Sequence, residues 1–285
     1  MNPNRSDAIE RAHTFSQLAK NKGFDIYCLH PDLLPGSKAF NKLEPADWQN
    51  EKSSQYNFEI AVVFGGDGTI LRAADSLYGS KIPIVGINLG NVGFLAEIAE
   101  PKLDQLLDAV IAGQYKLEPR ATLEYFLDRA GKVISHGWAI NEVTVERSNS
   151  QMMELFLSID GKPVSRWGCD SVIFSSPTGS TAYAFSAGGP VIWPEVEALL
   201  ITPVANHGLF SRSMVISNQS QASIDIESQA AGLVADGVRN TQLQQGDRIE
   251  MKLSTTKIYL AHFDNSVFTD RLVAKFRLPI SGWRR

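Results

Sequence analysis

A buried strand that runs directly into a glycine-rich turn and then a helix is the sequence feature that most constrains this fold. Residues 60–64 form an unbroken apolar run, which is typical of a parallel strand covered on both faces. The turn Gly65-Gly66-Asp67-Gly68-Thr69 follows, and residues 69–77 have helical periodicity. A second apolar run at 82–87 and a helical segment at 103–112 repeat the alternation. Alternating strands and helices predict an α/β domain with a parallel sheet and crossover helices.

The first helix of this region is predicted near the N-terminus. Ser6 or Asp7 is expected to cap it, because short polar side chains satisfy the first backbone N–H groups of a helix. Its apolar positions share one helical face: Ile9, Ala12, Phe15 and Ala19. The polar stretch 41–57, farther along, is interpreted as loop with a weak helix.

The chain becomes β-rich after Arg120. One hairpin is predicted from 122–127 through the turn at 128–131, and a second from 155–159 through Asp160-Gly161. Period-2 segments recur at 214–217, 223–227, 248–253 and 257–262. Short strands at such close spacing favour an all-β, sandwich-like second domain.

The length of 285 residues fits two domains, at roughly 150 residues each. We place the first, α/β domain at 1–118 and expect the C-terminal segment 262–285 to return to it. The second, β-rich domain is placed at 119–261.

Composition excludes several classes of protein. The net charge is −4, so bulk electrostatics do not predict a nucleic-acid binder. An apolar content of 44% with 20% charged residues is that of a globular chain and excludes a disordered or fibrous one. No apolar run approaches the roughly 20 residues that cross a bilayer, and the N-terminus lacks the apolar stretch of a signal peptide. Neither a membrane span nor secretion is therefore expected.

Cysteine and histidine usage adds to this interpretation. Cys28 and Cys169 are the only cysteines, which implies no disulfide framework and suits a reducing cytoplasm. The five histidines have no metal-ligand spacing and are interpreted as structural or solvent-facing. We expect a cytoplasmic protein without a dedicated metal site.

The glycine-rich turn around Asp67 is the strongest chemical signal. Glycines between a strand and a helix bring backbone N–H groups close to an anion, and the helix N-terminus adds partial positive charge. An acid in the middle of a phosphate-binding turn repels phosphate, but it makes sense if it holds Mg²⁺ or accepts a proton from a hydroxyl group. The alternative is a plain turn with Asp67 as helix cap. Arg72, one helical turn later, is a candidate phosphate ligand.

Two further segments are rich in glycine and small residues. The stretch 86–95 follows a predicted strand, at the sheet edge where open α/β folds bind ligands; a loop with Phe94 packed in the core is the alternative. The stretch 175–190 places hydroxyl residues beside Tyr183, which suits an adenine or ribose; a short capped helix is the alternative there. The P-loop pattern, the G-x-G-x-x-G pattern and the G-x-S-x-G pattern are all missing from the sequence.

Taken together, these segments resemble the bacterial type of NAD kinase. The segments occur in the family's order over roughly 60–255: Gly-Gly-Asp-Gly-Thr at 65–69, Gly-Ile-Asn and then Gly-Phe-Leu at 86–95, Asn141-Glu142, Cys169-Asp170 and Pro-Thr-Gly-Ser-Thr-Ala-Tyr at 177–183. The resemblance implies transfer of the γ-phosphate of ATP to the 2′-hydroxyl of the adenosine ribose of NAD, giving NADP. It also implies Mg²⁺ or another divalent cation on the phosphates, a β-rich dinucleotide-binding domain, and a homo-oligomer, either a dimer or a tetramer.

The family's functional residues can be carried onto matching positions of this sequence. Asp67 matches the catalytic acid, which is expected to activate the 2′-hydroxyl or help to hold the metal. With Arg72 and Phe94 added from the two turns, the predicted NAD-binding residues are Gly66, Gly68, Arg72, Phe94, Asn141, Glu142, Asp170, Thr181, Ala182, Tyr183 and Ser186.

Two other functions share part of this pattern. Diacylglycerol-type lipid kinases share the Gly-Gly-Asp-Gly-Thr turn, but their Asn-Glu pair usually lies a few residues beyond it, whereas Asn141-Glu142 lies far along this chain. A nucleotide-sensing module without catalysis would keep the binding residues and lose Asp67, which is present. The sequence leaves open ATP or polyphosphate as donor, and NAD or NADH as acceptor.

Overall fold

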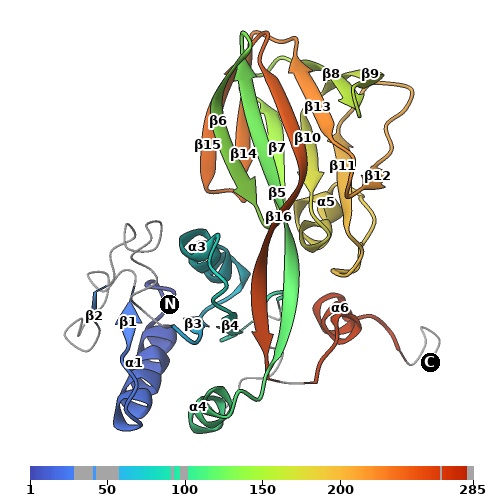
Figure 1. The fold of residues 1–285 in the computed structure, drawn as a ribbon. Helices are drawn as coiled ribbons and strands as arrows, with labels where there is room; N and C mark the ends of the chain where they lie inside the picture. Colours follow the sequence, from blue (N-terminus) through green and yellow to red (C-terminus); the bar gives the residue numbers. More distant parts are fainter. Residues whose placement is uncertain (29–40, 43–57, 91–92, 97–101, 264, 281–285) are drawn as a thin grey trace. The chain divides into compact units, whose positions relative to one another are not determined.

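The structure is a computed structural model, which describes residues 1–28, 41–42, 58–90, 93–96, 102–263 and 265–280. The chain divides into two compact units (Figure 1). Unit 1 comprises Met1–Pro119 and Ile258–Arg285, and unit 2 comprises Arg120–Lys257. The loop and weak helix expected at 41–57 lie outside the described residues, apart from 41–42.

Unit 1 is built on short parallel strands. β3 (Ala61–Phe64) pairs with β4 (Ile84–Ile87), in a register that sets Phe64 opposite Ile87. The last part of β16 (Arg248–His262) joins the other edge of β4, where Leu260 pairs with Ile84. The predicted α/β unit with a parallel sheet is therefore confirmed. Two further short strands pair in parallel, β1 (Tyr27–Cys28) and β2 (Asn41–Lys42).

The described residues of unit 1 form these helices beside the strands: α1 (Ser6–Asn21), α3 (Asp67–Leu77), α4 (Leu103–Ile111) and α6 (Phe268–Phe276). A core cluster joins α1 and α4 to the strands through Phe15, Phe64, Val85 and Leu106. None of the described helices is long and apolar enough to cross a membrane.

The start of α1 differs from the prediction. Arg5 occupies the N-cap position, and no side chain caps the helix, so neither Ser6 nor Asp7 has the predicted role. The reason is local: the Asp7 carboxylate accepts hydrogen bonds from the Arg5 guanidinium and from the N–H of Ala8. The buried face also begins at Ala8, while Ile9 is half-buried.

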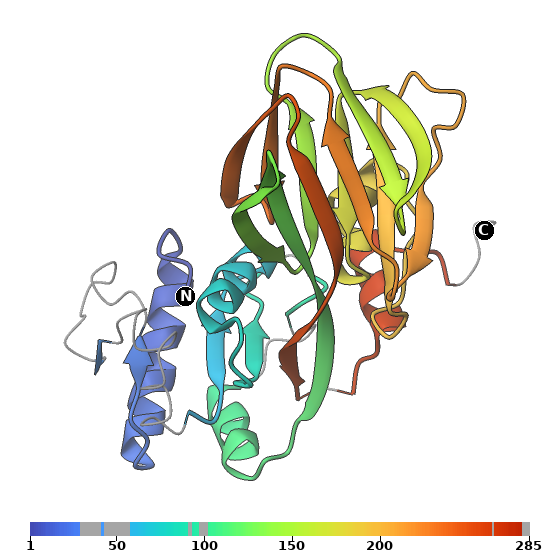
Figure 2. The ribbon, with the colours of Figure 1, turned by 45° about the horizontal axis from the view of Figure 1, so that its top comes forward.

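Unit 2 consists of antiparallel sheets, which confirms the all-β prediction. One sheet has the order β12-β11-β10-β7-β14-β15. A second contains β5 and β6 together with β16, β13, β8 and β9. A single core cluster draws buried side chains from both, including Leu123, Val145, Leu157 and Phe174, and Figure 2 shows the two sheets face to face.

The strands of unit 2 have these bounds: β5 Lys116–Arg129, β6 Lys132–Ala139, β7 Glu142–Arg147, β8 Met153–Ile159, β9 Lys162–Cys169, β10 Ser171–Ser175, β11 Ala198–Val204, β12 Met214–Ser217, β13 Ala222–Ile226, β14 Ala230–Ala235 and β15 Arg239–Gln244. β5 and β16 each continue into unit 1.

Both predicted hairpins are present, and their turns explain why. Ala130 and Gly131 have φ of 54° and 81°, and Asp160 and Gly161 have φ of 51° and 70°. Two successive positive φ values suit the twist of a two-residue hairpin. The segments predicted at 248–253 and 257–262 are both strand, but the break expected between them is wrong, because they form one strand, β16. The intervening polar residues continue the strand, and the carbonyl of Thr256 accepts a hydrogen bond from Thr122.

Candidate active site

The turn after β3 has a geometry that only glycine tolerates at its first position. Gly65 has φ of +154°, and a Cβ there would lie 2.4 Å from Oγ1 of Thr69. α3 then begins at Asp67, two residues earlier than the sequence predicted, with Gly66 at the N-cap and no side-chain cap. Asp67 is therefore not the cap of its own helix, and its carboxylate makes its hydrogen bonds outside α3.

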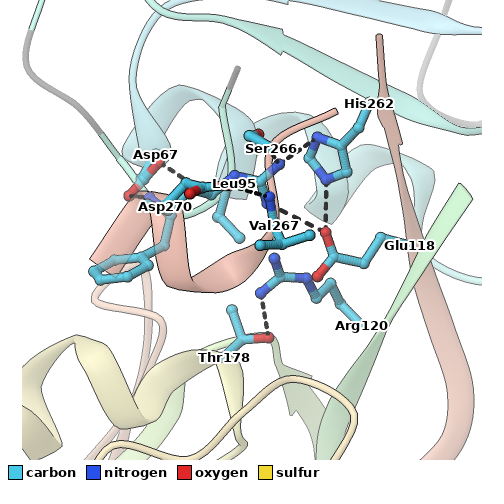
Figure 3. Close-up of polar contacts among 11 residues, drawn as sticks. Asp67, Leu95, Glu118, Arg120, Thr178, His262, Ser266, Val267 and Asp270 are labelled. Carbon is cyan, nitrogen blue, oxygen red and sulfur yellow. Dashed lines mark hydrogen bonds and ion pairs between the residues drawn. The ribbon is translucent and has the colours of Figure 1, made fainter. Parts of the chain in front are cut away.

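The Asp67 carboxylate is held by the second glycine-rich segment. Oδ2 accepts the N–H of Phe94 at 2.9 Å, and Oδ1 accepts the N–H of Leu95 at 3.2 Å (Figure 3). A Cβ at Gly93 would lie 2.0 Å from Oδ1, so glycine is required there for the carboxylate to fit. The structure thus brings two glycine-rich turns together around one carboxylate, which has a fixed direction.

The space beside the two glycines that flank Asp67 is open in the described part of the chain. A Cβ at Gly66 or at Gly68 would meet no atom of another described residue within 4 Å, chain neighbours aside. The N–H groups of the first turn of a helix have no partner within the helix and carry partial positive charge. An anion such as a phosphate group can therefore approach the backbone here. Arg72 lies exposed one turn along α3.

Phe94 contributes its backbone to this region. Its side chain is buried, and its ring lies 5.6 Å from that of Phe268 and 5.9 Å from that of Phe276, measured between centroids. The Phe94 ring packs in the core, as one of the two interpretations of this segment predicted. The backbone N–H of the same residue donates a hydrogen bond to Asp67.

In unit 2, the Asn141-Glu142 pair lies in a turn that one carboxylate organises. The oxygens of Asp236 accept the N–H groups of Ile140 at 2.8 Å, Asn141 at 2.7 Å and Glu142 at 3.4 Å. Arg239 donates to the same carboxylate at 3.1 Å. Burial raises the pKa of Asp236, and the three backbone hydrogen bonds and the Arg239 charge oppose that rise.

The segment 177–183 packs directly on the backbone of Asn141. The N–H of Ser176 donates to the Asn141 carbonyl at 2.9 Å. A Cβ at Gly179 would lie 2.0 Å from that same carbonyl oxygen, so only glycine allows this approach. The segment folds into a short 3₁₀ helix at Thr178–Thr181 and one helical turn, α5, at Tyr183–Ser186. The short-helix alternative is thus correct as local structure. The N-cap residues Pro177 and Ala182 provide no side-chain cap, but Oγ of Ser176 accepts the N–H of Gly179 at 3.2 Å.

Acidic side chains surround Tyr183, whose side chain is exposed. The N–H of Tyr183 donates to Glu142, and burial, with a contribution from the charge of Asp236, raises the pKa of Glu142 to about 8. The pKa of Tyr183 is raised by burial and by the charges of Glu146, Asp170 and Glu142. Asp170 also pairs with Arg147 at 3.1 Å. The oxygen atoms of these groups accept hydrogen bonds from hydroxyl groups or an amino group of a nucleoside, and the protonated Glu142 carboxyl group can also donate one.

The remaining predicted residues of unit 2 lie in the same segment: Thr181 and Ala182 are half-buried, and Ser186 is exposed. Within the described residues, no group of three or more His, Cys, Asp or Glu side chains is placed to hold a metal ion. The predicted residues thus form two sets: Gly66, Asp67, Gly68, Arg72 and Phe94 in unit 1, and the others in unit 2.

Sequence reasoning missed two residues that the geometry brings forward, Gly93 as the neighbour of Asp67 and Asp236 as the organiser of the 140–142 turn. Asp236 and Gly237 have φ of 49° and 68°, so in sequence they signal only the hairpin between β14 and β15. The Gly-Phe-Leu motif at 93–95 can be recognised in the sequence, but the motif does not indicate that its backbone contacts the Asp67 side chain.

The comparisons with known proteins agree over both units. The family model of the ATP-NAD kinase N-terminal domain matches residues 1–115, and that of the ATP-NAD kinase C-terminal domain matches residues 140–263. The chain belongs to the NAD kinase family. An NAD kinase of Mycolicibacterium paratuberculosis is 48% identical over 229 residues, which cover 79% of this chain and 74% of the relative. The lipid-kinase alternative has no support in these comparisons.

Two solved structures resemble the fold over most of this chain. An NAD kinase from Archaeoglobus fulgidus in complex with ATP has a TM-score of 0.65 at 31% identity, over 78% of this chain and 84% of that one. A yeast NADH kinase complexed with NADH has a TM-score of 0.87 at 24% identity, over 99% of this chain and 87% of that one. The second likeness shows the fold alone.

Proposed function

We propose that this chain transfers the γ-phosphate of ATP to the 2′-hydroxyl of the adenosine ribose of NAD, with Asp67 as the catalytic base. The observation that carries the proposal is the fixed Asp67 carboxylate, which two backbone N–H groups orient at the start of α3. Open space at Gly66 and Gly68 lies next to it. A carboxylate beside a phosphate-binding turn is the arrangement that phosphoryl transfer to a hydroxyl group requires.

Positioning supplies most of the rate in this proposal. A secondary alcohol is a weak nucleophile, so the reacting oxygen must be held in line with the phosphorus and its charge must be neutralised. Asp67 accepts the hydroxyl proton late in the reaction. The N–H groups at the start of α3 bind the phosphate side, and the exposed Arg72 adds positive charge there.

The residues fit a divalent cation held mainly by substrate. Magnesium typically binds one or two carboxylates together with substrate phosphates, and Asp67 is a single oriented carboxylate without a cluster of further acids among the described residues. Such an ion would neutralise charge on the phosphate oxygens. Asp67 would be its protein ligand in that case.

The β-rich unit binds the dinucleotide in this proposal. Asn141 and Glu142 receive the adenosine part. The carboxylate of Asp170 accepts hydrogen bonds from hydroxyl groups. The Glu142 carboxyl group, whose pKa of about 8 keeps it mostly protonated at neutral pH, can both donate and accept. The exposed Tyr183 offers a ring face on which a base stacks. Thr181, Ala182 and Ser186 complete the contacts.

We also propose a homo-oligomer, a dimer or a tetramer. β12 is an edge strand of its sheet, with Val215 exposed. Leu209 and Phe210 are exposed in the preceding loop. An unpaired edge beside apolar side chains is a surface that tends to be covered by another chain. Light scattering on the purified protein tests this, and a monomer at all concentrations would contradict it.

The activity is tested with purified protein, Mg²⁺ and a pair of substrates, with NADP detected by an NADP-specific dehydrogenase. We expect NADP from ATP and NAD. Parallel reactions replace ATP with polyphosphate and NAD with NADH, and these identify the preferred donor and acceptor. Phosphorylation of diacylglycerol without formation of NADP would contradict the proposal.

A further inference from the structure

The C-terminal helix α6 is fixed in unit 1 by few side chains. Its buried residues are Phe268 and Arg271, a ring and a permanent cation. A helix of 9 residues is too short to be stable alone in water. The contacts of these two side chains, together with that of the half-buried Phe276, therefore hold the helix in place.

Arg271 belongs to a network of buried and half-buried groups that includes Glu118 and His262, and its Nη2 also donates to Oγ of Ser266 at 3.4 Å. Its Nη1 donates to Oε2 of Glu118 at 3.2 Å, and its Nη2 lies 2.8 Å from Nδ1 of His262 (Figure 3). Nε2 of His262 lies 2.7 Å from the same Oε2 of Glu118. A guanidinium group only donates, so Nδ1 of His262 accepts, and the proton of the neutral ring is on Nε2. Nε2 is in close contact with Glu118 but does not make an aligned hydrogen bond with it.

This network makes the position of α6 sensitive to one residue. The Arg271 side chain is 1% exposed, and a buried cation is tolerated only where it is paired and hydrogen-bonded. Glu118 lies on β5 and His262 ends β16, so the cation on α6 is tied to both strands. Removal of the guanidinium leaves a carboxylate and an imidazole without their common donor.

The same helix contacts the residue that holds Asp67. The Phe94 ring lies against Phe268 and Phe276 of α6, and the Phe94 N–H donates to Oδ2 of Asp67. A continuous path of contacts thus leads from Arg271 through α6 and Phe94 to the carboxylate.

We propose that Arg271, together with Glu118 and His262, is a positioning group for the catalytic carboxylate. The network holds α6 against Phe94 and so fixes the N–H that orients Asp67. None of the three side chains touches substrate in this account. The inference rests on the proposed role of Asp67 as the base.

A double-mutant cycle in the full-length enzyme separates this role from a general structural one. Arg271→Met is made in the wild-type and in the Asp67→Asn background, and kcat and KM for NAD are measured. In the wild-type background we expect kcat to fall about 10-fold with KM changed by less than about 2-fold, because misplacement of a reacting group affects chemistry more than binding. In the Asp67→Asn background, the further loss in kcat should be below about 2-fold.

Arg129→Met is the matched control. Arg129 makes a bidentate pair with the buried carboxylate of Asp247 in unit 2, so its loss destabilises the fold in a similar way. It touches none of the residues on the path to Asp67. We expect both arginine variants to have a lower Tm. Only Arg271→Met should also lose kcat in a way that requires Asp67 to be present.

Equal loss of kcat in both backgrounds overturns the positioning role. Unchanged turnover in Asp67→Asn itself is a different failure, since it removes Asp67 from the proposed function. If Arg271→Met does not fold, Phe268→Leu replaces it, because that change keeps the ionic network and weakens the contact with Phe94. We expect about a 3-fold lower kcat with unchanged KM for this variant, and an unchanged kcat would overturn the inference.

Discussion

Two aspartates, one in each unit, bind consecutive backbone N–H groups, and the contrast between them separates chemistry from scaffolding. Asp67 accepts two such groups, is half-buried and lies beside glycines with open space around them. Asp236 accepts three, pairs with Arg239, and has a side chain only 4% exposed.

The number of hydrogen bonds that each carboxylate already accepts decides whether it can also contact a substrate. Two hydrogen bonds fix the direction of Asp67 and leave acceptor capacity for a reactant, since an ionised carboxylate has about four lone-pair sites. Asp236 has its capacity filled by backbone and arginine, and burial raises its pKa. Asp236 therefore shapes the turn that presents Asn141 and Glu142, while Asp67 is available for the reaction. Variants of these two carboxylates and of the residues around them test this contrast.

Gly93→Ala is expected to abolish the catalytic role of Asp67 while Asp67 itself remains unchanged in the sequence. The added methyl group would lie 2.0 Å from Oδ1, so the carboxylate must turn away, and a shift of about 1 Å costs on the order of 100-fold in kcat. Steady-state kinetics measure this. Gly90→Ala is the control in the same segment, because its Cβ meets only the flexible end of Arg5, at 3.3 Å. Similar losses for both variants would contradict the specific role of Gly93.

Glu142→Gln is expected to stabilise the fold in a way that depends on pH. The pKa of Glu142 is about 8 in the folded state, above its ordinary value of 4.5. The unfolded chain therefore loses this proton first, and the wild type loses stability as the pH rises from about 4.5 to about 8. Glutamine has no proton to lose. The free energy of unfolding of the variant should match that of the wild type near pH 4.5 and exceed it by about 2 kcal/mol at pH 8. This figure is below the full value that the pKa shift implies, because Glu142 is partly exposed to solvent.

Denaturant unfolding at several pH values measures this difference. A stability difference that stays constant across the pH range would show that the Glu142 carboxyl group is not the cause.

Asp236→Asn is expected to weaken NAD binding rather than chemistry. The amide group of asparagine is a donor, so it faces the backbone N–H groups of 140–142 with the wrong polarity. We expect KM for NAD to rise about 10-fold and kcat to change by less than about 3-fold. Asp247→Asn is matched, because Asp247 is also buried and accepts an arginine and the N–H of Gln244. Both variants should lower Tm, and an equal rise in KM for both would contradict the specific role of Asp236.

The sequence predicted those elements whose local pattern agrees with their surroundings. β3 and β4 are buried apolar runs, and the hairpin turns at 130–131 and 160–161 place glycine where φ is positive. β10 was missed because all of its residues are buried, two of them serines, so no alternation marks it. The polar residues near 254 suggested a break, yet the strand continues there.

The sequence predicted which motifs belong to the candidate site, but it did not predict the contacts that the residues of these motifs make. Asp67 and Asn141-Glu142 could be named from the order of the motifs. The hydrogen bonds of Asp236 join it to residues 94 to 96 positions earlier, and periodicity carries no information at that separation. The steric need for Gly93 likewise depends on a carboxylate 26 positions away in sequence, at Asp67.

The central claim is that Asp67 acts in chemistry and not in the binding of NAD. It is tested by measuring, for wild type and Asp67→Asn, the Kd for NAD by calorimetry and the turnover of NAD with ATP and Mg²⁺. The account predicts a Kd within about 2-fold of the wild type and a turnover lowered by roughly 100-fold or more, as loss of a general base does. A turnover that stays at the wild-type level, or one that falls only in proportion to a lost affinity for NAD, would contradict it.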